Sequence, residues 1–353
     1  MRGFRDRDFV QTWEDMFFCV IGNAHPKDRV ITYLKYVPSR LGRWGGGEQR
    51  YARILKSYTT ISVEEVLNFL KARYPYYVSK LENLGLEMIT VPVDRIKIHF
   101  KPEDKLRQLS MTKPDKLDRL ERAALELTKL LSETAGVDMR YLGVTGSILL
   151  GIHNPGFSDI DLVVYGRNNS FRVETTLEAL HEEGVIQRIT GERFRKWVVD
   201  KARQYNLSLK DAEEICRRTW NRGFYKDTPF SIHPVRIEEE VEVRYDDIRC
   251  LSEGSAKVRA VVIDDEDSLF LPAVYKVSEV EFLDGNPVQD LVEIVTYEGF
   301  YSGILKKGEW LEARGKVEKV VDRRNMKTYH RLLIGSFEAK ARDYVKPLSV
   351  EKG

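Results

Sequence analysis

Short apolar runs separated by polar turns begin the chain. Residues 17–22 and 30–37 are two such runs, joined by a polar turn, and they predict two strands. Residues 41–50, with three consecutive glycines, are expected to form a loop. A further strand is expected within 50–59, and 87–100 gives one more extended segment. The pattern between them, over 62–75, predicts a helix with Ser62 as its N-cap.

A helical period dominates the middle of the chain. Apolar residues recur at three- and four-residue steps before Gly136, which predicts a helix over 112–136; they are Leu117, Leu120, Ala124, Leu127 and Leu131. A strand then leads into Gly146, and the next strand, 158–166, precedes a helix capped by Ser170 and ended by Gly184. Helical pattern continues over about 191–221. A strand is expected near Ile232.

From about Cys250 the pattern changes to extended runs with frequent turn signals. Five or more antiparallel strands are predicted, separated by turns such as 284–287 and 307–308. Strands at this spacing favour a small β-barrel. Together these patterns predict an α+β protein of several domains: an N-terminal α+β domain over 1–105, a central mixed sheet with helices over 106–249, and a C-terminal barrel over 250–353.

Composition adds limits on the class of protein. The chain has 353 residues, enough for two to three domains, and 42% of them are hydrophobic. It contains no run of about 18 apolar residues, and its N-terminus lacks the pattern of a signal peptide, so we expect a cytoplasmic protein with no membrane span. Cys19, Cys216 and Cys250 show no paired spacing, which is typical of reduced thiols. The abundance of Lys, Arg and Glu fits a thermophile.

Candidate chemistry lies in one stretch, GVTGSILLGIHNPGFSDIDLVVYG, residues 143–166. Asp159 and Asp161 are two residues apart in an apolar strand, so their side chains point to the same face. Two adjacent carboxylates are unfavourable without positive charge, and hard divalent cations such as Mg²⁺ bind carboxylate oxygens. Gly146 and Ser147 follow a strand, where backbone amides and a hydroxyl are suited to bind phosphates.

This combination resembles the nucleotidyltransferase superfamily that includes DNA polymerase beta and the CCA-adding enzymes, over about residues 110–245. The matching motif is Gly146-Ser147 followed by Ser158-Asp159-Ile160-Asp161. The resemblance implies a polymerase-beta-like domain in which Gly146 and Ser147 contact the phosphates of a nucleoside triphosphate (NTP). It also implies that Asp159 and Asp161 bind Mg²⁺ or Mn²⁺. The whole chain further resembles an uncharacterised archaeal family of predicted nucleotidyltransferases, including a counterpart of HPKDRVITYLKYVP.

The superfamily usually carries a third carboxylate on a later strand, and this sequence departs from that pattern. The corresponding strand is FSIHPVRI, with Ser231 and His233 where an acid is expected. Imidazole acts as a base or a metal ligand, so His233 is a candidate catalytic residue. Asp227, or Glu240 and Glu242, would supply the carboxylate if the strands align differently; those three positions stay open.

Two classes of function follow. The first is a metal-dependent nucleotidyltransferase that transfers a nucleoside monophosphate from NTP to a hydroxyl acceptor, with RNA and DNA among the candidates. The second is a catalytically inactive module of the same fold that binds nucleic acid or protein. The net charge of +2 excludes a strongly basic nucleic-acid coat but leaves room for a local basic groove. The Gly-rich segment 43–48 lacks the Lys-Ser/Thr of a phosphate loop and predicts no separate nucleotide site.

Overall fold

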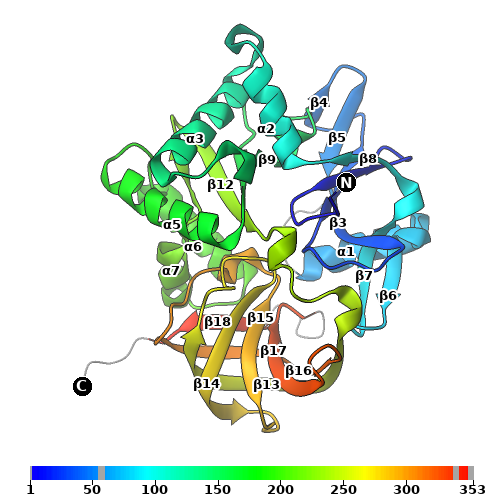
Figure 1. Cartoon of the computed structure of the whole chain (residues 1–353), viewed down its shortest axis with the longest axis vertical. Helices are drawn as coiled ribbons and strands as arrows, with labels where there is room; N and C mark the ends of the chain where they lie inside the picture. Colours follow the sequence, from blue (N-terminus) through cyan, green and yellow to red (C-terminus); the bar gives the residue numbers. More distant parts are fainter. Residues whose placement is uncertain (1, 55–59, 337–341, 349–353) are drawn as a thin grey trace. The chain divides into compact units, whose positions relative to one another are not determined.

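The computed structural model describes residues 2–54, 60–336 and 342–348. Its helices and strands form two compact units, each built from segments distant in the sequence (Figure 1). The first unit combines Met1–Lys56, Ile89–Ile189 and Trp220–Glu242, and the second combines Ser57–Met88, Thr190–Thr219 and Val243–Gly353. The domain boundaries expected at 105/106 and 249/250 stay predictions.

An antiparallel sheet begins the first unit. Its order is β4-β5-β3-β2-β1-β8, and β7 pairs with β3. The strands are β1 Phe9–Thr12, β2 Phe17–Val20, β3 Arg29–Pro38, β4 Trp44–Gly46, β5 Gln49–Arg53, β7 Leu86–Pro92 and β8 Ile96–Phe100. Strands β2 and β3 appear where the apolar runs predict them. Strand β5 covers only the first part of the segment 50–59 in which a strand is expected, and residues 55–59 lie outside the described residues. The single extended segment expected over 87–100 is two strands, β7 and β8.

The expected loop over 41–50 is in part a hairpin, so that prediction was wrong. Strands β4 and β5 pair there, with Trp44 opposite Tyr51. Gly45 and Gly47 have φ of +81° and +60°, a conformation that glycine adopts without steric cost. The glycines thus form the tight turn of a hairpin that the sequence pattern alone did not reveal.

A mixed four-stranded sheet is the second element of this unit, in the order β11-β12-β10-β9. Strand β12 runs parallel to β10, while β9 and β11 are antiparallel to their neighbours. The strands are β9 Leu142–Val144, β10 Ile160–Tyr165, β11 Arg222–Tyr225 and β12 Thr228–Val235. Four helices accompany them: α2 Pro102–Met111, α3 Arg119–Ala135, α4 Gly146–Leu149 and α5 Arg167–Glu182. Both α3 and α5 contact the central strand β10.

The helix bounds follow from local capping. Helix α3 starts after Asp118, whose side chain accepts from the Leu120 and Glu121 amides, and it ends at Gly136 in the left-handed conformation, as predicted. Helix α5 begins three residues before the expected cap Ser170, whose hydroxyl instead donates to the Gly166 carbonyl inside the first turn.

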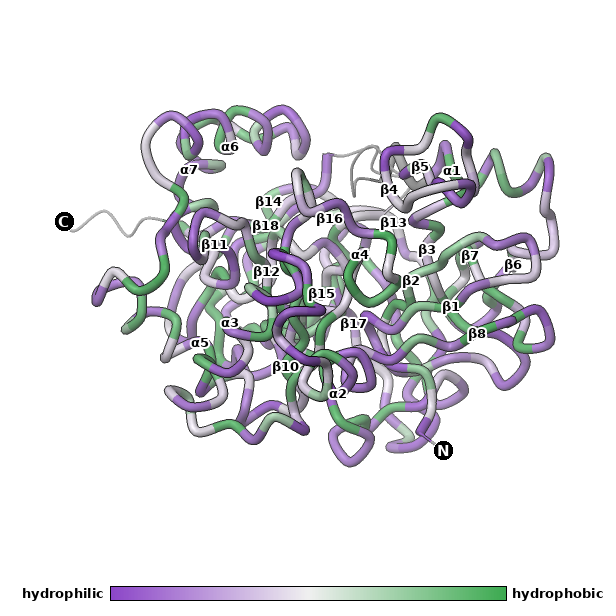
Figure 2. The backbone as a smooth tube through the Cα atoms, turned by 90° about the horizontal axis from the view of Figure 1, so that it is seen from above, coloured by the Kyte–Doolittle hydropathy of each residue, from purple (hydrophilic) through white to green (hydrophobic). Residues whose placement is uncertain are grey.

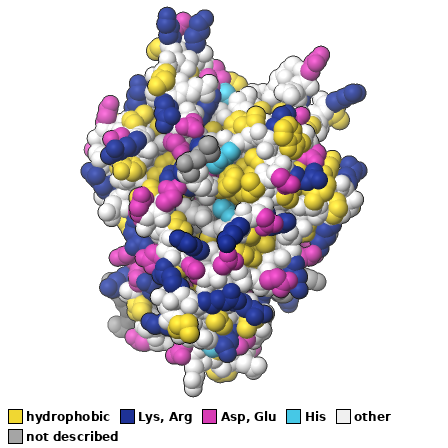
Figure 3. Space-filling view, turned by 45° about the vertical axis from the view of Figure 1, so that its right-hand side comes forward, with side chains coloured by type: hydrophobic (Ala, Val, Ile, Leu, Met, Phe, Trp, Pro, Cys, Tyr) yellow, Lys and Arg dark blue, Asp and Glu magenta, His cyan; other side chains and the backbone are white. Residues whose placement is uncertain are grey.

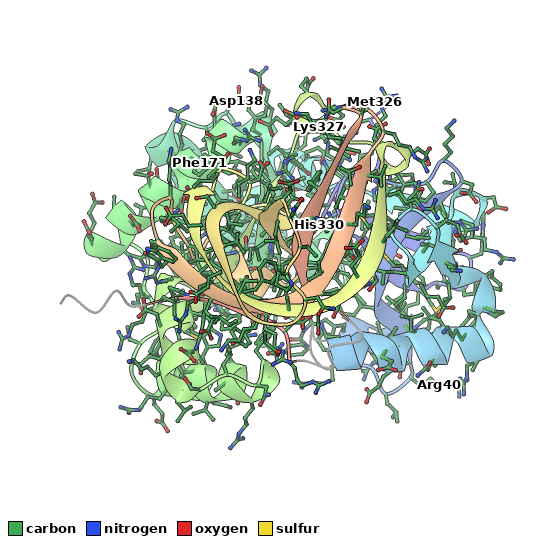
Figure 4. The ribbon with its side chains drawn as sticks, turned by 90° about the horizontal axis from the view of Figure 1, so that it is seen from below. Arg40, Asp138, Phe171, Met326, Lys327 and His330 are labelled. Carbon is green, nitrogen blue, oxygen red and sulfur yellow. The ribbon has the colours of Figure 1, made fainter. Side chains whose placement is uncertain are left out.

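The second unit is organised around a six-stranded sheet, order β13-β14-β15-β17-β16-β18, in which β13 also pairs with β16. That extra pairing closes five strands into a ring, seen from below in Figure 4, where Met326 and Lys327 mark the β16–β17 turn. The strands are β13 Ile248–Asp264, β14 Ala273–Asp284, β15 Leu291–Thr296, β16 Trp310–Asp322, β17 Lys327–Ile334 and β18 Tyr344–Pro347. Strands β15 and β17 are parallel, so the expected all-antiparallel arrangement holds for the other pairs only.

Helices α6 Gly191–Gln204 and α7 Leu209–Arg218 bury their apolar faces in the core of this ring. Green and purple alternate along both helices in Figure 2, as amphipathic helices require. The continuous helical stretch expected over 191–221 is interrupted at Asn206, which has φ of +51°, and Ser208 caps α7. This unit also contains α1 Thr60–Arg73 and β6 Val78–Leu81; α1 starts before Ser62, which is therefore not its N-cap.

Two bulk expectations can be compared with the structure. All three cysteines are buried free thiols. Among the described residues, no helix is both long and apolar enough to span a bilayer.

Candidate active site

The Gly-Ser pair lies at the end of β9, directly against the carboxylate of Asp161. Gly146 has φ of +67°, and a Cβ at this position would lie 2.2 Å from Asp161 Oδ2. The amide of the preceding residue, Thr145, donates to the Asp161 carbonyl at 2.9 Å. Ser147 follows and is buried in the short helix α4. Glycine is needed at 146 both for its backbone conformation and for the space that the carboxylate occupies.

Asp159 directly precedes β10, and Asp161 is the second residue of that strand. The negative charge of Asp161 raises the pKa of Asp159, whereas the positive charges of Lys35 and Arg53 act in the opposite direction. The two carboxylates are therefore close enough to repel each other. A bound cation between them would relieve that repulsion.

Two side chains of β12 surround the Asp161 carboxylate. Ser231 Oγ donates to Asp161 Oδ1 at 2.5 Å and lies 2.9 Å from His233 Nε2. The single proton of the Ser231 hydroxyl is donated to Asp161. The Ser231 oxygen therefore accepts a hydrogen bond from Nε2–H of His233, so the proton of the neutral imidazole lies on Nε2. Burial alone would raise the pKa of Asp161, but the nearby His233, Lys35 and Ser231 together lower it. Asp161 is thus held as an oriented anion.

The pH dependence of stability should report on His233. Burial first, and the charge of Arg7 second, lower its pKa to about 4, against about 6.5 when unfolded. Between pH 4 and pH 6.5 the unfolded chain binds more protons than the folded chain. The stability that the neutral, buried His233 contributes is therefore complete above pH 6.5 and is lost as the pH falls toward 4. It amounts to about 3 kcal/mol at most. We expect His233→Gln to flatten the fall in unfolding free energy, measured by urea denaturation over this range; equal slopes for the two proteins would contradict the assignment.

In the part of the chain that the structure describes, no third carboxylate joins the pair. Strand β12 places Ser231 opposite Asp161 and His233 opposite Val163. Asp227 lies in the β11–β12 turn, and Glu240 accepts from the Arg167 amide beyond the far end of β10. Over 2–54, 60–336 and 342–348, no further His, Cys, Asp or Glu forms a metal-binding group with Asp159 and Asp161.

One group of three potential metal ligands does occur elsewhere: Asp118, Glu121 and His153, with ligand atoms within 4.8 Å of one another. Asp118 and Glu121 form the capping box of α3, and His153 Nε2 lies 2.7 Å from Asp118 Oδ2. These bonds account for the cluster as the start of a helix. His153 thereby anchors the loop between Gly146 and Asp159 to the start of α3.

The N-terminal sheet contributes a residue that sequence reasoning missed. Lys35 of β3 is only 6% exposed, and its ammonium lies 5.3 Å from the centre of the Phe9 ring. Its charge lowers the pKa of both Asp159 and Asp161. The one available signal was a lysine in the middle of the apolar run VITYLKYVP. A buried lysine is uncommon without a nearby anion.

Two hydrogen bonds fasten the N-terminal sheet to the motif. Thr145 Oγ1 donates to the Arg7 carbonyl at 2.7 Å, and the Gly45 amide of β4 donates to the Ile152 carbonyl at 2.7 Å. One bond holds the residue before Gly146, and the other holds the loop that leads to Asp159. Segments more than a hundred residues apart in sequence therefore build one site.

Comparison with known proteins agrees with this geometry. Residues 137–219 match the nucleotidyltransferase domain family, so the chain contains a polymerase-beta-like nucleotidyltransferase domain. The match includes Gly146, Ser147, Asp159 and Asp161 but ends before β12.

Over nearly its full length, the chain is homologous to the uncharacterized protein MJ1086 of the archaeon Methanocaldococcus jannaschii. The two are 27% identical over 344 residues, which cover 97% of this chain and 98% of the relative. No solved structure gives a significant match. The resemblance stated from the motif is confirmed for the domain and for the archaeal relative.

Proposed function

We propose that the protein is a metal-dependent nucleotidyltransferase that transfers a nucleoside monophosphate from NTP to a hydroxyl acceptor. One observation carries the proposal: Asp161 lies against the Gly146 turn, and its charge acts on Asp159 two residues away, within a nucleotidyltransferase domain. The proposed catalytic residues are Asp159 and Asp161, with His233 as a positioning residue, and the proposed phosphate ligands are Gly146 and Ser147.

The donor set fits one hard divalent cation, Mg²⁺ or Mn²⁺. Asp159 and Asp161 offer carboxylate oxygens, and their mutual repulsion, seen in the raised pKa of Asp159, favours a cation. When bound, such an ion neutralises charge that develops on the transferred phosphoryl group. The missing third carboxylate supports one ion held by the chain itself rather than two.

The side chains around the pair would prepare it for this role. His233 and Ser231 fix the direction of Asp161 Oδ1 through the hydrogen bonds described above. Because Nε2 of His233 already donates to Ser231, His233 would act by positioning Asp161 rather than by taking the acceptor's proton through that nitrogen. Lys35 adds a fixed positive charge near the Asp pair. The flanking N-terminal sheet would select the acceptor, and we take the C-terminal ring to be a small β-barrel.

A second candidate function rests on the Ser231 and His233 positions. Without a third acid, the domain would bind nucleotide, nucleic acid or protein but would not catalyse nucleotidyl transfer. The intact Asp pair favours the enzyme, because binding alone does not require two adjacent carboxylates on one face.

Titration of radiolabelled NTPs with and without Mg²⁺, followed by a transfer screen against RNA, DNA, protein and small-molecule hydroxyls, tests the proposal. We expect NTP binding that depends on Mg²⁺ or Mn²⁺, and release of pyrophosphate with at least one acceptor. Metal-dependent binding with no transfer to any acceptor would favour the inactive module. NTP binding that is indifferent to metal would contradict the metal site.

A further inference from the structure

A basic, aromatic surface lies beside the loop between Gly146 and Asp159, and the proposed function gives this surface no role. We call it the hairpin surface. It consists of Arg43, Trp44 and Arg53, in and beside the β4–β5 hairpin, and of the loop residue Phe157; Arg40 and Arg50 belong to the same segment of the chain. The four arginines are exposed, Trp44 is half-buried, and Phe157 is 39% exposed.

Planar groups of this surface lie against one another. The guanidinium carbon of Arg43 is 4.5 Å from the centre of the Phe157 ring. The Trp44 ring meets Phe157 edge to face at 5.5 Å, and the Arg53 guanidinium carbon is 5.8 Å from the Trp44 ring. The result is a contiguous set of flat, partly exposed faces.

The hairpin surface is fixed to the candidate active site. Phe157 comes two residues before Asp159 in the same loop. The Gly45 amide in the hairpin donates to the Ile152 carbonyl of that loop. The charge of Arg53 also reaches Asp159, whose pKa it lowers. A molecule bound on these faces would therefore end close to the carboxylate pair.

Charge on this surface is local. Residues 38–53 contain four arginines and one acid, Glu48, in a chain whose net charge is only +2. On the face drawn in Figure 3, Lys and Arg are interspersed with Asp and Glu. Closely spaced arginines attract a phosphate backbone, and exposed aromatic and guanidinium planes stack on unpaired bases.

We propose that the hairpin surface binds the terminal nucleotides of a single-stranded nucleic acid and directs its end hydroxyl toward Asp159 and Asp161. A duplex, whose bases are already stacked, would not present free base faces. An acidic peptide would use the arginines but not the aromatic faces. In the resulting reaction the terminal hydroxyl oxygen forms a bond to the α-phosphorus of NTP, the bond from that phosphorus to the pyrophosphate oxygen breaks, and the hydroxyl proton passes to water. The inference rests on the proposed function, since it names the acceptor.

Fluorescence anisotropy of the full chain with a labelled single-stranded RNA of about 12 nucleotides tests this assignment. We expect Arg43→Ala to weaken binding about tenfold, since it removes both a charge and a stacking plane. Arg43→Lys, which keeps the charge, should weaken binding less. The matched control is Arg140→Ala: Arg140 is also exposed and lies over an aromatic ring, Tyr141, at the opposite end of β9. It should bind as the unaltered protein does.

Phe157→Leu, which keeps apolar bulk but lacks a π face, gives a second measurement and should also weaken RNA binding. Equal loss in Arg140→Ala, or no RNA binding by the unaltered chain at low salt, would overturn the proposal. So would polyglutamate binding that is as tight as RNA binding and equally sensitive to Arg43→Ala, since that assigns the surface to a protein partner.

Parallel NTP titrations separate this proposal from the proposed function. Arg43→Ala should leave Mg²⁺-dependent NTP affinity unchanged; a loss confined to NTP would place the nucleotide's own base on the hairpin and overturn the acceptor assignment. RNA binding that depends on Arg43, in a protein that does not bind NTP, would refute the transferase proposal and leave the surface as a nucleic-acid site.

Discussion

Asp161→Asn is expected to abolish transfer from NTP while leaving the fold intact. Asparagine keeps an oxygen that can accept the Ser231 hydrogen bond, so the local structure should survive, but it removes the negative charge that would hold the cation. Loss of metal-assisted charge stabilisation, worth several kcal/mol, corresponds to a rate at least about 1,000-fold lower. The measurement is pyrophosphate release with the best acceptor from the screen, alongside urea denaturation of the same protein.

The matched control for this substitution is Asp227→Asn. Asp227 is an exposed carboxylate in the β11–β12 turn, where φ is +62°, a conformation that asparagine also tolerates. We expect it to transfer at the unaltered rate, which would also remove Asp227 from the candidates for a third acid. A transfer rate unchanged by Asp161→Asn would refute the proposed metal site.

Gly146→Ala should lower both stability and transfer, although it adds a single methyl group. The alanine Cβ would lie 2.2 Å from Asp161 Oδ2, at φ of +67°. The left-handed backbone costs about 1–2 kcal/mol, and the steric overlap adds a further 1–3 kcal/mol, or about 3 kcal/mol in total. We also expect transfer to be lost, because relief of the overlap displaces the Asp161 carboxylate from its bonds to Ser231.

Gly151→Ala separates backbone strain from steric overlap. Gly151 has the same φ of +67°, but nothing lies within 4 Å of the Cβ that a substitution would add. It should cost only the strain of about 1–2 kcal/mol and leave transfer in place. If urea denaturation gave the same loss of stability for both alanine variants, steric overlap between residue 146 and Asp161 would not contribute to the loss in Gly146→Ala.

The parts of the site that are contiguous in sequence could be predicted. Two carboxylates two residues apart in an apolar strand must share a face, and a glycine at a strand end is typical of a turn with unusual backbone. These local rules located Gly146, Asp159 and Asp161. The capped helix α3 and the short apolar strands were predictable for the same reason, because their periodicity is set by neighbouring residues.

What could not be predicted depends on pairing between distant segments. Ser231 was placed on the correct strand, but its bond to Asp161 depends on the register of β12 on β10. Lys35 and the β4–β5 hairpin reach the site only through the packing of the N-terminal sheet. The hairpin itself was missed because consecutive glycines indicate flexibility in a sequence and give no sign of the partner strand, which here makes the turn ordered.

The position of β10 between β9 and β12 has a consequence for the growing chain on the ribosome. Strand β10 is complete at Tyr165, but its parallel partner begins only at Thr228, 63 residues later. Chain synthesis proceeds at about 5–20 residues per second, so the apolar edge of β10 is without that partner for roughly 3–12 s. An unpaired, hydrophobic edge strand promotes association with other chains. Fragments that end before β12 should therefore aggregate, and synthesis of the whole protein should depend on chaperones during this interval.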